Sequence, residues 1–167
     1  MDTDTAMTDR QTTVSMTVLM TPDMANFSGN VHGGSILKIL DEVAFACASN
    51  YARSYVVTVS VDWVLFREPI HVGDLVTFSA AVNYAGRTSM EIGIHVDTVD
   101  IQSGTTRHTN SCYFTMVAVD SDGRPVESPP YTRRTPSRSN ASRPRAAAAP
   151  PVTEIARTPH ENWHRRS

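Results

Sequence analysis

The segment NFSGNVHGGSILKILDEVAFA, residues 26–46, places two asparagines and three glycines just ahead of a helix that carries Asp41. Two adjacent glycines, Gly33 and Gly34, stand where this helix is predicted to begin, and they allow a ligand to approach the backbone closely. The first N–H groups of a helix have no partner within it and carry partial positive charge, which suits an oxyanion. A carboxylate two turns further on can act as a general base toward water. These residue types predict water-mediated cleavage of an acyl group.

Asp41 is unusual because helical spacing places it between Leu37, Phe45 and Ala48 instead of among the polar residues. The polar arc of the helix is formed by Ser35, Lys38, Glu42 and Ser49. Burial of an unpaired carboxylate is costly or raises its pKa, so an acid on this side needs a reason. Either it lies at the edge of the polar face and bonds to a neighbouring loop, or it borders a cleft whose other edge is the glycine turn.

One helix and five strands are expected to position these groups. The helix runs from about Gly33 to Tyr51, with Ser35 as one candidate for the capping residue. Strands are predicted at residues 13–20, 54–66, 75–86, 88–101 and 105–120, where β-branched and alternating residues occur. Long consecutive strands joined by short turns form an antiparallel sheet, so the fold class is α+β with one helix on the sheet. An open sheet edge then favours pairing with a second copy.

The composition suits a single globular domain between a leader and a tail. The chain has 167 residues, of which 40% are hydrophobic. We predict a flexible leader over residues 1–11, the folded domain over 12–132 and a disordered Arg-, Pro- and Ala-rich tail over 133–167. The net charge of -2 combines -8 in residues 1–132 with +6 in the tail. The basic tail is interpreted as solvated, so no specific nucleic-acid partner is predicted.

The cellular setting is predicted from what the sequence lacks. No apolar run reaches the roughly 18 residues of a membrane-spanning helix, so membrane insertion is not expected. The polar, acidic N-terminus is unlike a secretory signal. Cys47 and Cys112 do not form a CxxC pair and are interpreted as reduced structural thiols. A cytoplasmic protein is the resulting prediction.

The segment ANFSGNVHGGSILKILDEVAFACASNYA, followed by VVTVSVDWVLFREPIHVGDLVTFSAAVNYAGRTSMEIGIHV, closely resembles the hot-dog-fold acyl-CoA thioesterases with an Asn, Gly-Gly and Asp arrangement. The resemblance covers about residues 12 to 128. It implies a curved antiparallel sheet wrapped around one long central helix, and dimers joined edge to edge that often assemble as trimers of dimers, giving a hexamer. It also implies hydrolysis of fatty acyl-CoA to a free fatty acid and CoA, with no metal or redox cofactor.

The resemblance also implies roles for the residues described first. Asp41 corresponds to the general base, or to a nucleophile that attacks the thioester directly. Asn26 of the partner subunit corresponds to the residue that positions the water or the thioester carbonyl. The backbone N–H of Gly34, with Gly33 beside it, corresponds to the oxyanion site.

Further candidates for substrate contacts lie on the predicted strands. Thr58 and Ser60 can hydrogen-bond the catalytic water or Asp41, although ordinary strand alternation also explains them. The resemblance places the segment with Arg87, Thr88 and Ser89 beside the CoA cleft. Arginine suits phosphate recognition, so Arg87 is either a CoA contact or a solvent-facing hairpin residue.

The histidines do not indicate a metal site. His32 either shapes the glycine loop or takes a direct part in catalysis. His71, His95 and His108 occupy turn or strand positions without metal-ligand spacing, so no metal is predicted. Two other functions remain open. A hot-dog hydratase or dehydratase would need a histidine paired with an acid, and a non-catalytic acyl-CoA-binding sensor would have no need of a base such as Asp41.

Overall fold

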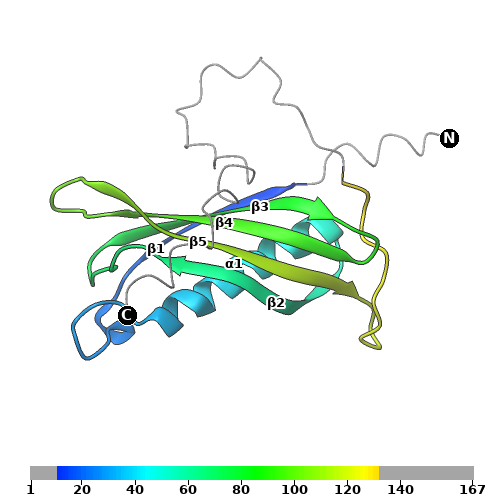
Figure 1. Ribbon diagram of the computed structural model, residues 1–167, viewed down its shortest axis with the longest axis horizontal. Coiled ribbons are helices and arrows are strands. Elements are labelled where there is room, and N and C mark those ends of the chain that lie inside the picture. Colours follow the sequence, from blue (N-terminus) through cyan, green and yellow to red (C-terminus); the bar gives the residue numbers. More distant parts are fainter. Residues whose placement is uncertain (1–10, 132–167) are drawn as a thin grey trace, which may run out of the picture. The chain divides into compact units, whose positions relative to one another are not determined.

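The computed structural model describes residues 11–131 (Figure 1). The predicted leader, apart from residue 11, and the predicted tail lie outside the described residues. The elements in chain order are β1 (Thr13–Leu19), the short 3₁₀ helix η2 (Pro22–Met24), α1 (Gly33–Ala52), β2 (Tyr55–Phe66), β3 (Leu75–Ala85), β4 (Ser89–Val99) and β5 (Thr106–Val119). The predicted helix and the five predicted strands are confirmed, each ending within two residues of its expected position.

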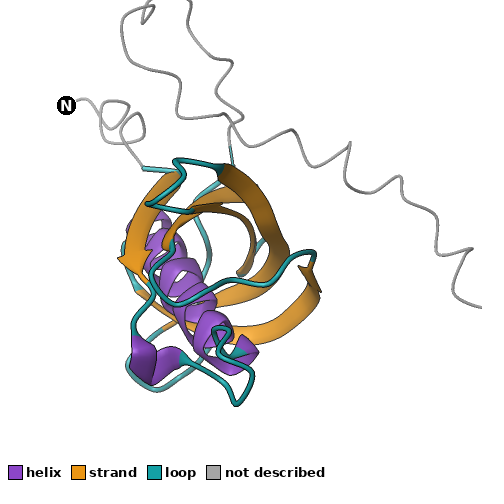
Figure 2. Ribbon diagram, turned by 90° about the vertical axis from the view of Figure 1, so that its left-hand side faces the viewer, coloured by secondary structure: helices purple, strands orange, loops and turns teal. Residues whose placement is uncertain are grey.

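The five strands form one antiparallel sheet in the order β1-β3-β4-β5-β2. Figure 2 shows the sheet curving around α1, which contacts all five strands. This arrangement confirms the predicted α+β class and the hot-dog architecture. Because β1 and β2 are the two edge strands, β2 has one side without a partner strand in the described chain.

The core lies between the concave face of the sheet and α1. Strand alternation sends every second side chain of β3, β4 and β5 toward the helix. The buried strand residues include Val76, Phe78, Ala80, Val82, Met90, Ile92, Ile94, Val96, Cys112, Phe114, Met116 and Ala118. The helix contributes Ile36, Ile39, Leu40, Val43, Ala44, Cys47, Ala48 and Tyr51. Both cysteines are therefore core residues with free thiols.

The start of α1 differs from the prediction. His32, not Ser35, is the N-cap residue, and its Nδ1 accepts a hydrogen bond of 2.9 Å from the Gly34 N–H. The Ser35 N–H donates to the His32 carbonyl at 2.9 Å. An imidazole acceptor thus replaces the hydroxyl or carboxylate oxygen that more often caps a helix, which is why the usual capping signals pointed to Ser35.

Two β-bulges interrupt β2. Its register with β5 shifts between Thr58 and Ser60 and again between Val61 and Trp63. A bulge adds one residue to a strand and reverses the faces of the residues beyond it. Side chains two positions apart on β2 therefore do not always share a face. Among the described residues, none of the helices is both long and apolar enough to cross a membrane.

Candidate active site

Asp41 lies on the exposed side of α1 and bonds to β2. The Thr58 hydroxyl donates a hydrogen bond of 2.6 Å to Asp41 Oδ1. The helix neighbours one turn away, Leu37 and Phe45, are 39% and 38% exposed. Asp41 is itself exposed within one chain. The acid thus lies in an open apolar stripe and bonds to a strand, rather than to the neighbouring loop considered from the sequence.

Ser60 lies on the opposite face of β2 from Thr58. The bulge between them separates two side chains that simple alternation would place together. The Ser60 hydroxyl donates 2.6 Å to Asp62 Oδ1, and the Thr115 hydroxyl donates 2.8 Å to Asp62 Oδ2. These hydrogen bonds, from Ser60 first and then Thr115, lower the pKa of Asp62 below its usual value. The structure therefore brings Thr58, and not Ser60, to Asp41.

Asn26 is held in a tight turn before α1. Its Oδ1 accepts hydrogen bonds from the N–H groups of Ser28 and Asn30, at 2.9 and 3.2 Å. Its backbone N–H donates to the Asn30 carbonyl at 2.7 Å. Because the side-chain oxygen is engaged with the turn, the amide Nδ2 is the group of Asn26 that can act on a ligand, and it acts as a donor.

A cleft of about 390 Å³ opens beside this turn. Its lining includes Asn26, Gly33, Phe66, Arg67 and Glu68. The Phe66 ring lies 3.7 Å from the place where a Cβ on Gly33 would stand, which is ordinary van der Waals contact, so Phe66 flanks the start of α1. Sequence reasoning did not single out Arg67. Its position in the sequence could have identified it, because Arg67 is a cation directly after β2, the strand that carries Thr58.

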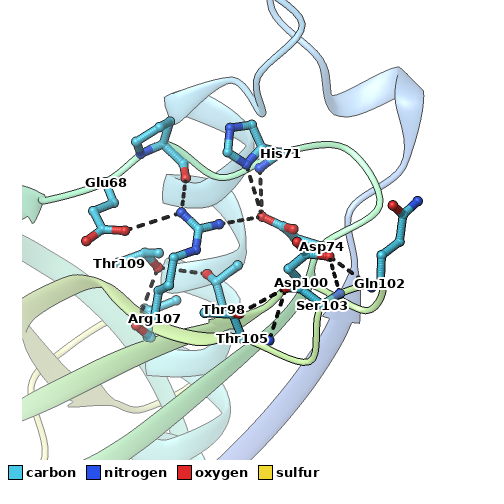
Figure 3. Close-up of polar contacts among 12 residues, drawn as sticks. Glu68, His71, Asp74, Thr98, Asp100, Gln102, Ser103, Thr105, Arg107 and Thr109 are labelled. Carbon is cyan, nitrogen blue, oxygen red and sulfur yellow. Dashed lines mark hydrogen bonds and ion pairs between the residues drawn. The ribbon is translucent and has the colours of Figure 1, made fainter.

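The loop between β2 and β3 is fixed to β5 by Arg107, as Figure 3 shows. Its Nη1 donates to Glu68 Oε2 at 3.3 Å and to the Pro69 carbonyl at 3.2 Å. Its Nη2 donates to Asp74 Oδ2 at 3.0 Å, and the Asp74 side chain is buried. A planar guanidinium suits several such acceptors at once. Arg107 therefore positions the loop that forms one wall of the cleft.

The same loop also holds the segment that follows Asn26. The Val31 N–H donates to the Ile70 carbonyl at 2.8 Å, and Asn30 forms a β-bridge with His71. The turn with Asn26 is therefore held by its own hydrogen bonds and also by backbone contacts to the β2–β3 loop, which Arg107 fixes in place.

The Gly34 N–H is engaged within the chain. It donates to His32 Nδ1, as described for the helix cap. A Cβ on Gly34 would lie 3.1 Å from that nitrogen, so the ring stands directly over the glycine. An oxyanion that binds this N–H must therefore displace the imidazole of His32.

Arg87, Thr88 and Ser89 lie at the β3–β4 hairpin. The Gly86 N–H donates to the Ser89 carbonyl at 2.8 Å, and the Ser128 N–H donates to the Arg87 carbonyl at 2.8 Å. Thr58 of β2 and Met90 of β4 both pair with Met116 of β5, so this hairpin lies at the level of Thr58 with β5 between them.

Exposed apolar side chains occur along β2 beside Asp41, on both faces of the strand. The exposed apolar side chains of β2 are Tyr55, Val57, Val59, Val61, Trp63, Leu65 and Phe66. Leu37 and Phe45 extend this surface onto α1, and the Phe45 ring meets the Tyr55 ring edge-on at 5.8 Å. Exposed apolar side chains along an unpaired strand edge indicate an interaction site.

Comparison with known proteins agrees with this architecture. The thioesterase superfamily model matches residues 28–105. The protein VdlD of Helicobacter pylori is 48% identical over 125 residues, which cover 75% of this chain and 71% of that protein. An uncharacterized acyl-CoA thioester hydrolase of Zymomonas mobilis is 34% identical, over 68% of this chain and 76% of that protein. The mouse acyl-coenzyme A thioesterase 11 is 34% identical, but the match spans only 20% of its length.

Solved structures of acyl-CoA thioesterases and hydrolases also match this chain. A hexameric acyl-CoA thioesterase superposes with a TM-score of 0.71 and 36% identity, covering 74% of this chain and 79% of that one. An acyl-CoA hydrolase of Staphylococcus aureus, solved with butyryl coenzyme A, has a TM-score of 0.67 and 31% identity, covering 71% of this chain and 72% of that one.

The Staphylococcus aureus enzyme has also been solved with an asparagine, an aspartate or a threonine replaced by alanine. The intervals between those three positions, 15 and 17 residues, equal the intervals between Asn26, Asp41 and Thr58. The fold, the matched relatives and these intervals together show that the chain belongs to the thioesterase superfamily, among the hot-dog-fold acyl-CoA thioesterases.

Proposed function

We propose that this protein hydrolyses fatty acyl-CoA to a free fatty acid and CoA, at a site completed by a second copy of the chain. One observation carries the proposal: Asp41, held by Thr58, lies on an open apolar surface, whereas the cleft beside Asn26 has neither residue in its lining. A second copy that covers the free side of β2 would bring its own Asn26 turn to Asp41.

Asp41 acts as the general base. The hydrogen bond from Thr58 orients the carboxylate through Oδ1 and leaves Oδ2 to accept a proton from water. The water oxygen attacks the thioester carbonyl carbon, and a tetrahedral oxyanion forms. Collapse of this intermediate breaks the carbon–sulfur bond, and the proton held by Asp41 passes to the departing CoA sulfur. Direct attack by Asp41, through a mixed anhydride that water then opens, is the alternative course.

Two donors stabilise the oxyanion. Asn26 of the second copy donates from Nδ2, because its Oδ1 is engaged in the turn. The Gly34 N–H donates once the substrate has displaced His32 from it. Stabilisation of the oxyanion by such donors is usually the largest single contribution to the catalysis of acyl transfer.

The assembly follows from the free edge of β2. Pairing of two β2 edges satisfies the open backbone groups and covers the exposed apolar side chains around Val59. The proposed dimer assembles further into a trimer of dimers, and hexameric solved relatives support this step.

The substrate class is proposed from the surroundings of Asp41. Leu37 and Phe45 offer an apolar wall to a fatty acyl chain. Arg67 beside the cleft and Arg87 at the hairpin are the proposed contacts for the CoA phosphates, with Thr88 and Ser89 next to Arg87. The base, the donors and water complete the reaction without a metal or redox cofactor. We place the protein in the cytoplasm, in keeping with its two free thiols.

The test is release of free thiol from acyl-CoAs ranging from acetyl to stearoyl, with wild type and Asp41→Asn measured side by side. Turnover that the variant loses supports the proposal, and the best substrate reports the length of the acyl site. Tight binding of acyl-CoA without thiol release would favour the non-catalytic sensor. Addition of water to an enoyl-CoA without thiol release would favour a hydratase.

A further inference from the structure

Two histidines and an aspartate meet on the outer face of the sheet, away from α1. His95 and Asp97 lie two positions apart on β4, and strand pairing places His108 of β5 directly opposite Asp97. His95 Nε2 lies 2.9 Å from Asp97 Oδ1, and His108 Nδ1 lies 3.6 Å from the same oxygen. One ligand atom from each of the three residues falls within 4.8 Å of the others.

A bulge in β5 creates this cluster. The register with β4 passes from Val96 paired with Asn110 to Asp97 paired with His108, so Thr109 is the extra residue. Simple alternation would send His108 to the buried face with Asn110. The bulge turns His108 outward instead, where its Nε2 lies 2.9 Å from the Ser111 hydroxyl.

Some polar atoms of the cluster have no hydrogen-bond partner within it. The Nδ1 atoms of His95 and His108 are buried and have no hydrogen-bond partner. If His108 Nε2 donates to Ser111, its Nδ1 carries a lone pair that faces the carboxylate of Asp97. If Ser111 is the donor, the Nδ1 proton lies too far from Asp97 at 3.6 Å for a hydrogen bond. With the proton on Nε2, a cation between the Nδ1 lone pair and the carboxylate would satisfy the buried Nδ1.

We propose that His95, Asp97 and His108 bind a divalent first-row transition-metal ion, with zinc the best match, at a site separate from the thioesterase site. Imidazole and carboxylate suit such an ion, and two histidines with one carboxylate are a known set of zinc ligands that leaves a fourth position for water. Donor atoms around one tetrahedral zinc ion stand about 3.3 Å apart, between the two distances observed here. Ser111 supplies the outer contact that fixes the orientation of a ligating histidine.

Both histidine rings must turn before they can bind one ion. The rings of His95 and His108 stack with centroids 3.9 Å apart and planes 11° from parallel. An ion shared by both lies between the ring planes, so each ring must turn to direct its lone pair at the ion. The terminal torsion of a histidine is broad, which permits this turn. The side chains are 19%, 30% and 30% exposed for His95, Asp97 and His108, so an ion can reach them from solvent.

The experiment is titration of the metal-stripped, full-length protein with ZnCl₂ by isothermal titration calorimetry. We expect one zinc ion per chain. Asp97→Asn and His108→Gln each weaken zinc binding at least about tenfold, and Ser111→Ala, which keeps all three ligands, weakens it by roughly tenfold as an outer-contact change. Thermal unfolding gives the second readout: zinc raises the melting temperature of the wild type and not of His108→Gln.

Two controls address three of the four other histidines of the chain. His71→Gln removes an exposed histidine outside the cluster, and a double change of His160 and His164 to Gln removes those near the C-terminus. Both variants should bind zinc as the wild type does. The proposal is overturned if the wild type does not bind zinc, if Asp97→Asn and His108→Gln bind it undiminished while folded, or if the double variant abolishes binding.

Discussion

The hydroxyl of Thr58 donates a hydrogen bond of 2.6 Å to Asp41 Oδ1, joining β2 to the central helix at the one acid of the exposed apolar stripe. Ser60, two positions further along the strand, is turned to Asp62 by a bulge. The two hydroxyls therefore provide a matched pair for mutation, one at the proposed site and one on the other face.

Replacement of Thr58 by valine should lower kcat by about tenfold to a hundredfold, because a hydrogen bond to a charged group contributes about 1.5–3 kcal/mol. KM should change little, since the bond orients the base and does not hold the substrate. Thr58→Ser should restore most of the activity. Ser60→Ala is the control and should leave kcat near the wild-type value. An equal loss of kcat in Ser60→Ala and Thr58→Val would show that the two hydroxyls contribute equally, although the bulge places them on different faces of β2.

Loss of the proposed base Asp41 should lower kcat far more than loss of the Thr58 hydroxyl does. Asp41→Asn keeps the size and shape of the side chain and should reduce kcat by roughly 10²- to 10⁴-fold, the usual contribution of general-base catalysis. The variant should keep its oligomeric state in light scattering, because the acid is not a packing residue. Glu42→Gln, one position away on the polar face, is the matched control. Activity of Asp41→Asn close to that of Glu42→Gln would rule out the proposed base.

His32 should matter for stability more than for chemistry. His32→Ala removes the acceptor of the Gly34 N–H and should lower the free energy of unfolding by about 1 kcal/mol, as for other N-cap replacements. Denaturant titration measures this loss. Thioesterase activity should survive, because the imidazole only covers the N–H that the oxyanion later uses. A loss of activity as deep as that of Asp41→Asn would instead favour a histidine-dependent mechanism.

The free edge of β2 should control assembly. Val59 is 61% exposed on this strand, so Val59→Asp should place a charge in the proposed interface and shift the protein toward monomers with little activity. Ile101 is similarly exposed, at 58%, in the turn after β4 and provides a matched control in Ile101→Asp. Light scattering coupled to gel filtration reports the mass. An unchanged mass for Val59→Asp would place the interface elsewhere.

The buried thiols should make the protein sensitive to alkali. Burial raises the pKa of Cys47 and of Cys112 from 9.0 to about 12. Between these values the folded chain keeps thiol protons that the unfolded chain releases, so the free energy of unfolding should fall as the pH rises from about 9 to 12. Cys47→Ala and Cys112→Ala should each flatten this decline, even if they lower stability at neutral pH. If the free energy of unfolding fell with pH at the same slope in both variants and in the wild type, the buried thiols would not be the cause of the decline.

The sequence was sufficient to predict the elements and the unusual position of Asp41 on the helix. Alternation marked the buried residues of β4, and helical spacing set Asp41 apart from Lys38 and Glu42, which form an ion pair at 3.8 Å. The bulges could not be predicted. They depend on how β2, β4 and β5 pair along their whole length, and they decide the faces of Ser60 and His108.

Other parts of the site were also beyond sequence reasoning. The cap by His32 was missed because imidazole is not among the usual N-cap acceptors. Arg107 acts through the loop after β2, and its partners Glu68 and Asp74 are distant in sequence. Arg67 belongs to the lining of the cleft beside that loop. The proposed meeting of Asn26 with Asp41 joins two copies of the chain, and only the family resemblance, not the residues of one chain, suggested it.

The most direct test of the central claim is complementation between two inactive variants. Asn26→Ala and Asp41→Asn are purified separately and after co-expression, and thioesterase activity is compared. If each site takes Asn26 from one copy and Asp41 from the other, half of the sites in a mixed dimer are intact, and random pairing restores about a quarter of wild-type activity. If both residues act from the same chain, every site in every pairing lacks one of them, and co-expression would give no recovery.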